Sequence, residues 1–347
     1  MKQRWVIVIG VVAACGGKQP SLSSVVDSGN TGSGSDDDAS GNVPPAVAAG
    51  PYFQKPMFWN RDVSGVAKSS NSAAQIASLK SAGGFGNTRL EIDFTIEVLT
   101  ADANAPKRTF TKNSSFYSPD CDNVAVPVPP NGNLEGETGY ACTTGGDCHL
   151  IVHDPAAGTL YEMWKASITG TNTFSGGCLA AWDTTKAYDA ALRGDQCTRA
   201  DAAGYPIAPL LFTADEVAAG TIDHAIRFIL PNDRIRRGYV RPATHGTDTT
   251  GGSNAPPYGV QLRLRADYPV DSLPSAGAKV VARAMQKYGM YHADGGIIAL
   301  TAQSDRRTTA KWNGLLAARD LQAIKIEDFE VIDNGGMITL TYDCSRD

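Results

Sequence analysis

Hydrophobic and polar residues alternate along several short stretches beyond residue 50, and this alternation predicts β-strands. The clearest stretch is 90–98, where every second residue from Leu90 to Val98 is apolar and each residue between them is polar. The segment 260–266 alternates similarly. Because successive side chains of a strand point to opposite faces, such strands have one face on a core and one toward water, as in antiparallel sheets. Further strands are expected at 222–230, 238–244 and 337–342.

The helices that the sequence predicts are few and short. A capping box at 213–216 opens a helix that ends at Gly220, and the segment 275–288 carries an apolar stripe that ends at Gly289. Other short helices are expected at 72–81, 184–192 and 312–321. Many strands with scattered helices predict a mainly β fold, an antiparallel, jelly-roll-like β-sandwich with a few short surface helices. Without a repeat or a second linker, 51–347 is expected to be a single domain.

The first 15 residues have the pattern of a bacterial lipoprotein signal. Lys2 and Arg4 precede a short apolar run, and small residues lead to Cys15. The run is about half of the roughly 20 apolar residues that span a bilayer, so a signal peptide is favoured over a transmembrane helix. We therefore expect lipidation at Cys15. An ordinary secretory signal with an incidental cysteine is the alternative.

The segment 16–50 is rich in Ser, Gly and Asp and nearly lacks large apolar residues. Such a sequence cannot bury enough surface to offset the entropy of ordering, so we expect a disordered tether. The predicted location is the cell envelope, at the outer membrane or cell surface or else in the periplasm. Contact with the membrane is expected only through the lipid anchor.

Composition and charge exclude several classes of protein. The 347 residues include 31 basic and 36 acidic side chains, a net charge of −5, which argues against nucleic-acid binding and a polybasic membrane surface. Six cysteines follow Cys15, and an even number in an oxidising compartment predicts up to three disulfides with 15 possible pairings. Their spacing lacks the paired C-x2-C pattern of zinc sites, and we expect neither a metal nor a cofactor.

The segment 149–165 predicts a β-hairpin with chemically useful side chains. Turn residues at 154–158 separate two strands. If Asp154 pairs with Thr159, Ile151 lies opposite Glu162. One face then carries His149, His153, Glu162 and Trp164, and the other, core-like face carries Leu150, Val152, Tyr161 and Met163. A slip of one residue would exchange the two faces.

An imidazole, a carboxylate and an indole on one open face could bind and process a sugar. We expect Glu162 as the acid/base and Asp183 as the second carboxylate, with His149 and His245 as orienting or proton-shuttling groups. Trp164, Trp182 and His153 are the expected substrate-binding residues. The alternative is an ordinary polar outer face with Trp164 under a loop.

A second acidic motif lies on the strand at 91–97. Its carboxylates resemble the E-x-D-x-E strand of laminarinase-type glycosidases, but Thr95 stands where that motif has a carboxylate. Asp93 and Glu97 are four residues apart, about 13 Å along an extended strand, which is too far for paired catalytic carboxyl groups. A solvated strand face is therefore preferred.

Three segments resemble a family of exported bacterial β-rich proteins without a settled activity. They are the hairpin His149–Glu162, Ala181–Asp183 and Gln286–Gly296, within a resemblance that covers about 58–333. The resemblance implies one secreted, β-rich domain and carries over no catalytic residue.

These observations lead to three hypotheses about function. The first is a lipoprotein that acts on a polysaccharide, as a glycoside hydrolase. The second is a non-catalytic module that binds a glycan or a protein, and the third is a structural envelope lipoprotein without a pocket beside the hairpin.

Overall fold

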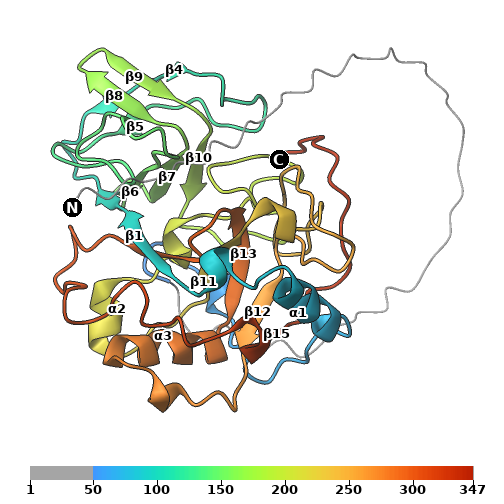
Figure 1. Ribbon diagram of the computed structural model, residues 1–347. Coiled ribbons are helices and arrows are strands. Elements are labelled where there is room, and N and C mark those ends of the chain that lie inside the picture. Colours follow the sequence, from blue (N-terminus) through green and yellow to red (C-terminus); the bar gives the residue numbers. More distant parts are fainter. Residues whose placement is uncertain (1–49, 347) are drawn as a thin grey trace, which may run out of the picture. The chain divides into compact units, whose positions relative to one another are not determined.

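The largest sheet of the protein has six strands and is mixed. In the computed structural model, which describes residues 50–346, parallel pairing joins β1 to β14 and β11 to β13, and the other pairs are antiparallel. In order across the sheet, the strands are β1 (Ile92–Ile96), β14 (Leu300–Gln303), β11 (Ile226–Leu230), β13 (Met290–Gly295), β12 (Gln261–Leu264) and β15 (Phe329–Val331) (Figure 1). The predicted signal, Cys15 and the tether up to residue 49 lie outside the described residues.

The mainly β fold is confirmed, whereas the prediction of purely antiparallel sheets is wrong. Alternation along one strand reports which face is buried, but it says nothing about the direction of the neighbouring strand. Parallel neighbours need a long crossover connection. The chain from β11 to β13 supplies such a connection, since it contains β12 and the helix α3 (Ala276–Lys287).

A second, four-stranded sheet contains the hairpin. Its strands, in order, are β10 (Leu179–Asp183), β7 (Thr159–Met163), β6 (Leu150–Asp154) and β2 (Val98–Thr100). In the hairpin Asp154 pairs with Thr159, and Ile151 pairs with Glu162, so the predicted register is confirmed. Strand β10 continues the antiparallel pairing, and β2 adds a parallel edge to β6.

Both faces of this second sheet are buried. On one face Leu150, Val152, Tyr161 and Met163 belong to a smaller apolar cluster, as predicted for a core face. On the other face Ile151, Leu160, Ala180 and Trp182 belong to the main core of the protein. The division of the residues between the faces is therefore correct, but the predicted open face packs against the rest of the protein.

Two small sheets and three disulfides complete the β part. The small sheets are β3 (Lys107–Arg108) with β5 (Val126–Pro127), and β4 (Thr111–Lys112) with β9 (Thr173–Gly176) and β8 (Ser167–Gly170). The disulfides are Cys121–Cys178, Cys142–Cys148 and Cys197–Cys344, as expected for six cysteines in an oxidising compartment. Within residues 50–346, no helix is both long and apolar enough to span a bilayer.

Three of the five predicted helices form. They are α1 (Ser72–Ser81), α2 (Ala214–Ala219), whose capping box is present, and α3, whose cap is Ser275. Helix α1 contacts β15 and α3 contacts β12 (Figure 1). The segments 184–192 and 312–321 are turns. The segments 238–244 and 337–342 form only isolated bridges, which join Tyr239 to Ile338 and to Tyr258.

Candidate functional site

Glu162 lies in the interior of the protein, and the prediction that it faces an open surface is wrong. Its side chain is fully buried. Its carboxylate accepts hydrogen bonds from the backbone N–H groups of Ile207 and Ala208, at 2.8 Å each, and from Nε1 of Trp182 at 3.1 Å. Burial raises the pKa of Glu162 to about 7. Because all its partners are protein donors and no part reaches solvent, this carboxylate holds the turn at 207–208 to the sheet.

Asp183 and Trp182 do not form a site with Glu162 on an open face. Asp183 is exposed and accepts bonds from the N–H and hydroxyl of Thr185, and these bonds lower its pKa. Trp182 is fully buried and lies on the opposite face of β10 from Asp183, covered by the guanidinium of Arg199. The proposed sugar platform is therefore a core residue.

His149 is buried beside Glu135. Its Nδ1 lies 2.6 Å from Glu135 Oε2, and its Nε2 lies 3.1 Å from the carbonyl oxygen of Ala200. Although burial opposes a charge here, the carboxylate of Glu135 raises the pKa of His149 to about 9. His149 is therefore an imidazolium at neutral pH, with both N–H groups donating, and cannot serve as a general base.

The other two predicted histidines lie elsewhere. His245 is buried and bonds the carbonyl oxygen of Ala202 at 2.9 Å, and burial lowers its pKa to about 4. His153 is half-buried, with its ring edge-on to Tyr52 and its pKa lowered by burial. The structure thus brings His149 close enough to Glu162 for its charge to lower the pKa of that carboxyl, but it does not join the predicted residues into one open site.

A different group of carboxylates surrounds Arg227 on one face of the six-stranded sheet. Arg227 Nη2 lies 2.8 Å from Asp201 Oδ2 and 3.6 Å from Asp294 Oδ2. Its Nη1 donates to the hydroxyl of Thr301, which pairs with Asp93 on β1. Because paired residues of neighbouring strands share a face, Asp93, Thr301 and Arg227 lie in a row across the sheet.

Of the two carboxylates that pair with Arg227, Asp294 is the one that reaches solvent. Asp201 is completely buried, whereas the side chain of Asp294 is 29% exposed. Burial, together with the negative charge of Asp201, raises the pKa of Asp294 to about 7, although Arg227 acts in the opposite direction. Asp294 therefore keeps a proton over part of the neutral range and can give it to a partner.

Asp147, in the loop before the hairpin, has its pKa displaced in the opposite direction from that of Asp294. Its side chain is 60% exposed and accepts a bond of 2.9 Å from Nε1 of Trp164, which is half-buried. Although the surrounding protein partly desolvates it, the charge of His149 and the bond from Trp164 hold the pKa of Asp147 below its usual value. The charge of Asp147 in turn helps to raise the pKa of Asp294. Two carboxyl groups whose pKa values are displaced in opposite directions are the usual signature of an acid/base pair.

We define the candidate site by Asp147, His149, Trp164, Arg227 and Asp294. Asp93 lies beside it and has its pKa raised, first by burial and then by the charge of Glu135. Glu97, the other carboxylate weighed in the acidic motif, is buried and pairs with Arg306 and Arg307, so the expected solvated strand face is wrong at Glu97. The two carboxylates of that motif therefore do not converge.

Sequence reasoning found Trp164 and His149 but missed Asp147, Arg227 and Asp294. Asp294 lies in the segment 286–296, and Asp147 lies two residues before the hairpin that begins at His149. A loop carboxylate next to a disulfide cysteine was the available signal for Asp147. The neighbourhood of Arg227 and Asp294 depends on the parallel pairing of β11 with β13, which no local pattern indicates.

Two clusters of possible metal ligands occur among the described residues, one with Asp120 and one with Glu137. Each also contains both sulfurs of a disulfide, and it is the thiolate that ligates metals. Neither cluster can hold an ion in the oxidised protein.

Comparison with known proteins does not place the chain in a family. No family model, curated protein or solved structure matches it. The resemblance to exported bacterial proteins stays a prediction.

Proposed function

We propose that the protein is an extracytoplasmic hydrolase that cleaves a glycan by acid/base catalysis at the candidate site. The observation that supports this proposal is the opposite displacement of the pKa values of Asp147 and Asp294, both of which reach solvent. Glycoside hydrolysis needs one carboxylic acid that is still protonated near neutral pH and one carboxylate that is ionised.

The residues divide the reaction between them. Asp294 gives its proton to the glycosidic oxygen as the bond from that oxygen to the anomeric carbon breaks. In an inverting reaction the carboxylate of Asp147 takes a proton from the water that attacks that carbon. In a retaining reaction the carboxylate itself forms an ester with that carbon, and water, which gives a proton to Asp294, then hydrolyses the ester. The half-buried indole of Trp164 offers apolar surface to a pyranose ring. The indole N–H and the backbone N–H of Lys165 both donate to Asp147 and hold it in place.

The charge of the site favours a particular substrate class. With Asp294 protonated, the four carboxylates of Asp93, Glu135, Asp147 and Asp201 still outnumber the three cations Arg227, His149 and Lys165. A neutral or amino sugar is therefore preferred to a uronate or sulfated sugar, because an anionic ring would meet like charge.

The test is a polysaccharide panel that contains neutral, amino and uronate polymers, incubated with the purified full chain. We expect released oligosaccharides from the neutral or amino polymers. Their release should fall as the pH rises through about 7, where Asp294 loses its proton. The variant Asp294→Asn should release none, while Asp183→Asn, at the exposed end of β10, should match the wild type. Equal release by Asp294→Asn would remove that residue from the mechanism.

A non-catalytic glycan-binding module is the second candidate. The observation that favours it is the half-buried indole of Trp164 beside the exposed carboxylate of Asp147, which can contact a sugar ring without any cleavage. Affinity for a glycan without any product would support this function over hydrolysis.

The location and the finer architecture also belong to this proposal. The three disulfides indicate an oxidising compartment. We propose in addition a lipid at Cys15, attachment to the cell envelope and a sandwich-like relation of the two larger sheets. Metabolic labelling with a fatty acid, lost in Cys15→Ser, tests the anchor.

A further inference from the structure

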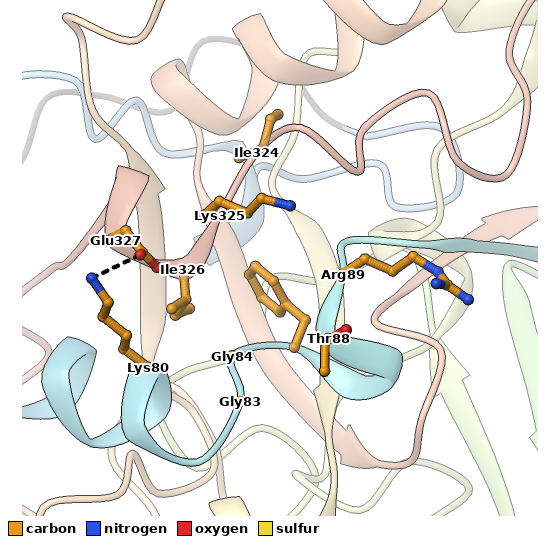
Figure 2. A pocket seen from close by; sticks show the side chains of 10 residues that line it. Lys80, Gly83, Gly84, Thr88, Arg89, Ile324, Lys325, Ile326 and Glu327 are labelled. Atoms are coloured by element: carbon orange, nitrogen blue, oxygen red, sulfur yellow. Dashed lines mark ion pairs between the residues drawn. The ribbon is translucent and has the colours of Figure 1, made fainter.

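A surface hollow of about 260 Å³ lies between the end of α1 and the segment 324–327, but its charged groups are already bonded (Figure 2). Lys80 Nζ lies 2.9 Å from Glu327 Oε1, and Lys325 Nζ donates to a backbone carbonyl oxygen. The apolar side chains at its base are at most 3% exposed. The hollow therefore offers a ligand little free surface. The loop that carries Asp147 differs from it, because that loop is exposed and is restrained by a covalent bond.

The segment 142–148 is a small loop that carries Asp147 and is closed by the Cys142–Cys148 disulfide. Its five inner residues, 143–147, are all exposed. Gly145, with a left-handed φ of 72°, and Gly146 directly precede Asp147, and glycine gives the backbone more freedom than other residues do. The disulfide therefore joins the ends of a short, exposed segment whose own sequence does not fix the position of Asp147.

Cys148 has an unusual backbone conformation, and its cross-link to Cys142 restrains it. Its φ angle of 51° is left-handed, which is unfavourable for a residue with a Cβ atom. None of the other five cysteines within residues 50–346 has such a φ angle. Because Asp147 directly precedes Cys148, the direction of its side chain depends on this conformation. In the oxidised protein that direction brings the carboxylate to Trp164 Nε1, at 2.9 Å.

The Cys142–Cys148 bond is also the disulfide whose opening disturbs the fold least. It spans 6 residues, whereas Cys121–Cys178 and Cys197–Cys344 span 57 and 147. A cross-link that closes a shorter loop removes less entropy from the unfolded chain and so stabilises the fold less. When it is open, Glu137 still accepts hydrogen bonds from residues 143 and 144, at 2.6–2.8 Å. The part of the loop that loses a restraint is therefore its end, around Asp147.

The surroundings of the two sulfur atoms suit reduction. Cys142 is partly exposed, so a thiolate can reach its Sγ from solvent, whereas Cys148 is fully buried. Cys148 Sγ lies 3.7 Å from Oε1 of Glu137, so after reduction its thiol can donate to a charged acceptor. Exposed or strained disulfides are in general the labile ones, and this bond combines an exposed loop with a left-handed cysteine.

We propose that the Cys142–Cys148 bond is a redox switch for the candidate site and is opened by a protein dithiol. A thiolate of the dithiol attacks Cys142 Sγ, and the sulfur of Cys148 leaves and takes up a proton. The second thiol of the reductant then attacks the reductant's own sulfur in the mixed disulfide and releases Cys142 as a thiol. The reductant becomes a disulfide, so two electrons and two protons pass to the protein.

Opening the bond changes the site because Cys148 can then leave the left-handed region, which moves Asp147 away from Trp164. The effect on glycan cleavage rests on the proposed function. The opening of the bond and the movement of Asp147 do not depend on it.

The first measurement shows which disulfide opens first in the purified full chain. The protein is equilibrated with graded ratios of reduced to oxidised dithiothreitol, free thiols are alkylated, and mass spectrometry identifies the alkylated cysteines. We expect Cys142 and Cys148 to react at a ratio about tenfold or more below that needed for the four remaining disulfide cysteines. Earlier opening of Cys121–Cys178 or Cys197–Cys344, or opening of all three bonds together, would overturn the proposal.

The second measurement follows the indole N–H groups by ¹H–¹⁵N NMR. The Trp164 signal, assigned with Trp164→Phe, should shift when the bond opens, because its acceptor Asp147 moves. The Trp182 signal is the internal control for folding, because that N–H donates to the buried carboxylate of Glu162. The double variant Cys142→Ser/Cys148→Ser should show the shifted Trp164 signal without any reductant. A Trp164 signal that reduction leaves unchanged would show that the bond does not position Asp147.

Glycan cleavage gives the third measurement, which separates this proposal from the proposed function. Where the oxidised protein releases oligosaccharides, opening the bond should lower their release about tenfold, because the ionised carboxylate is displaced. The Cys142→Ser/Cys148→Ser variant should no longer respond to reductant. Unchanged release after selective opening would overturn the switch and leave the hydrolase in place. If the oxidised protein cleaves no polymer, the proposed function fails, and the first two measurements still decide whether the bond opens and positions Asp147.

Discussion

Glu162 and Asp294 are both acidic side chains with a pKa raised to about 7, yet their surroundings differ in kind. Glu162 has no exposed surface and is bonded by three N–H donors from the turn at 207–208 and from Trp182. Asp294 is partly exposed, with Arg227 on one side and solvent on the other. A displaced pKa therefore marks a candidate for chemistry only where the group can also reach a substrate.

The largest expected effect is the loss of stability when Glu162 is removed. Glu162→Ala leaves three buried donors without a partner, so the free energy of unfolding should fall by about 3–5 kcal/mol. Urea unfolding followed by circular dichroism measures this change. A loss below about 1 kcal/mol would contradict the structural role of Glu162.

The next largest effect is a loss of turnover without a loss of stability, expected for a change at Asp147. Asp147→Asn removes the ionised partner, so turnover of any glycan substrate should fall about 100-fold or more. The same change removes a charge that helps to raise the pKa of Asp294, so the alkaline limb of the pH profile should move to lower pH. Its unfolding free energy should stay within about 0.5 kcal/mol of the wild type, because Asp147 is exposed. Unchanged turnover would exclude Asp147 from the reaction.

A smaller effect should appear in the pH dependence of stability, through His149. Its pKa is raised in the folded protein from 6.5 to about 9, so the folded state holds this proton more tightly than the unfolded chain does. The resulting stabilisation is fully present below about pH 6.5 and is lost as the pH rises through about 9, a change of about 1–3 kcal/mol. Unfolding curves at pH 6 and pH 9.5 measure it. Glu135→Gln should remove most of the difference, because it removes the partner of His149.

The smallest effect is expected at Asp183. Asp183→Asn changes an exposed carboxylate that bonds only Thr185. Unfolding free energy should change by less than about 0.5 kcal/mol, and binding or turnover of a glycan should not change. A large loss of activity in Asp183→Asn would show that Asp183 takes part in the reaction, contrary to its placement outside the candidate site.

Local patterns predicted local structure well. The turn residues 154–158 gave the correct hairpin register, and the capping residues Thr213 and Ser275 marked the starts of α2 and α3. Such features depend on neighbouring residues, whose side chains and backbone interact whatever the rest of the chain does.

Contacts between residues far apart in the sequence could not be predicted from such local patterns. The polar face of the hairpin gave no sign that the main core would cover it, because alternation distinguishes two faces but not what packs on each. The closeness of Arg227 to Asp201 and Asp294 follows from sheet pairing and a loop, across separations of 26 and 67 residues. A polar residue that bonds a buried turn, such as Glu162, has the same sequence signature as a solvated one.

The connectivity of the cysteines has a consequence for how the chain becomes oxidised. Cys142–Cys148 is nested inside Cys121–Cys178, so the first of these six cysteines to be synthesised is not bonded to the next one. Oxidation in the order of synthesis would join Cys121 to Cys142. Maturation to the native pairing therefore requires either that folding precedes oxidation or that a thiol catalyst reshuffles the first bonds. Of the six cysteines, Cys197 remains without its native partner for the longest part of synthesis, because Cys344 is 147 residues further along the chain.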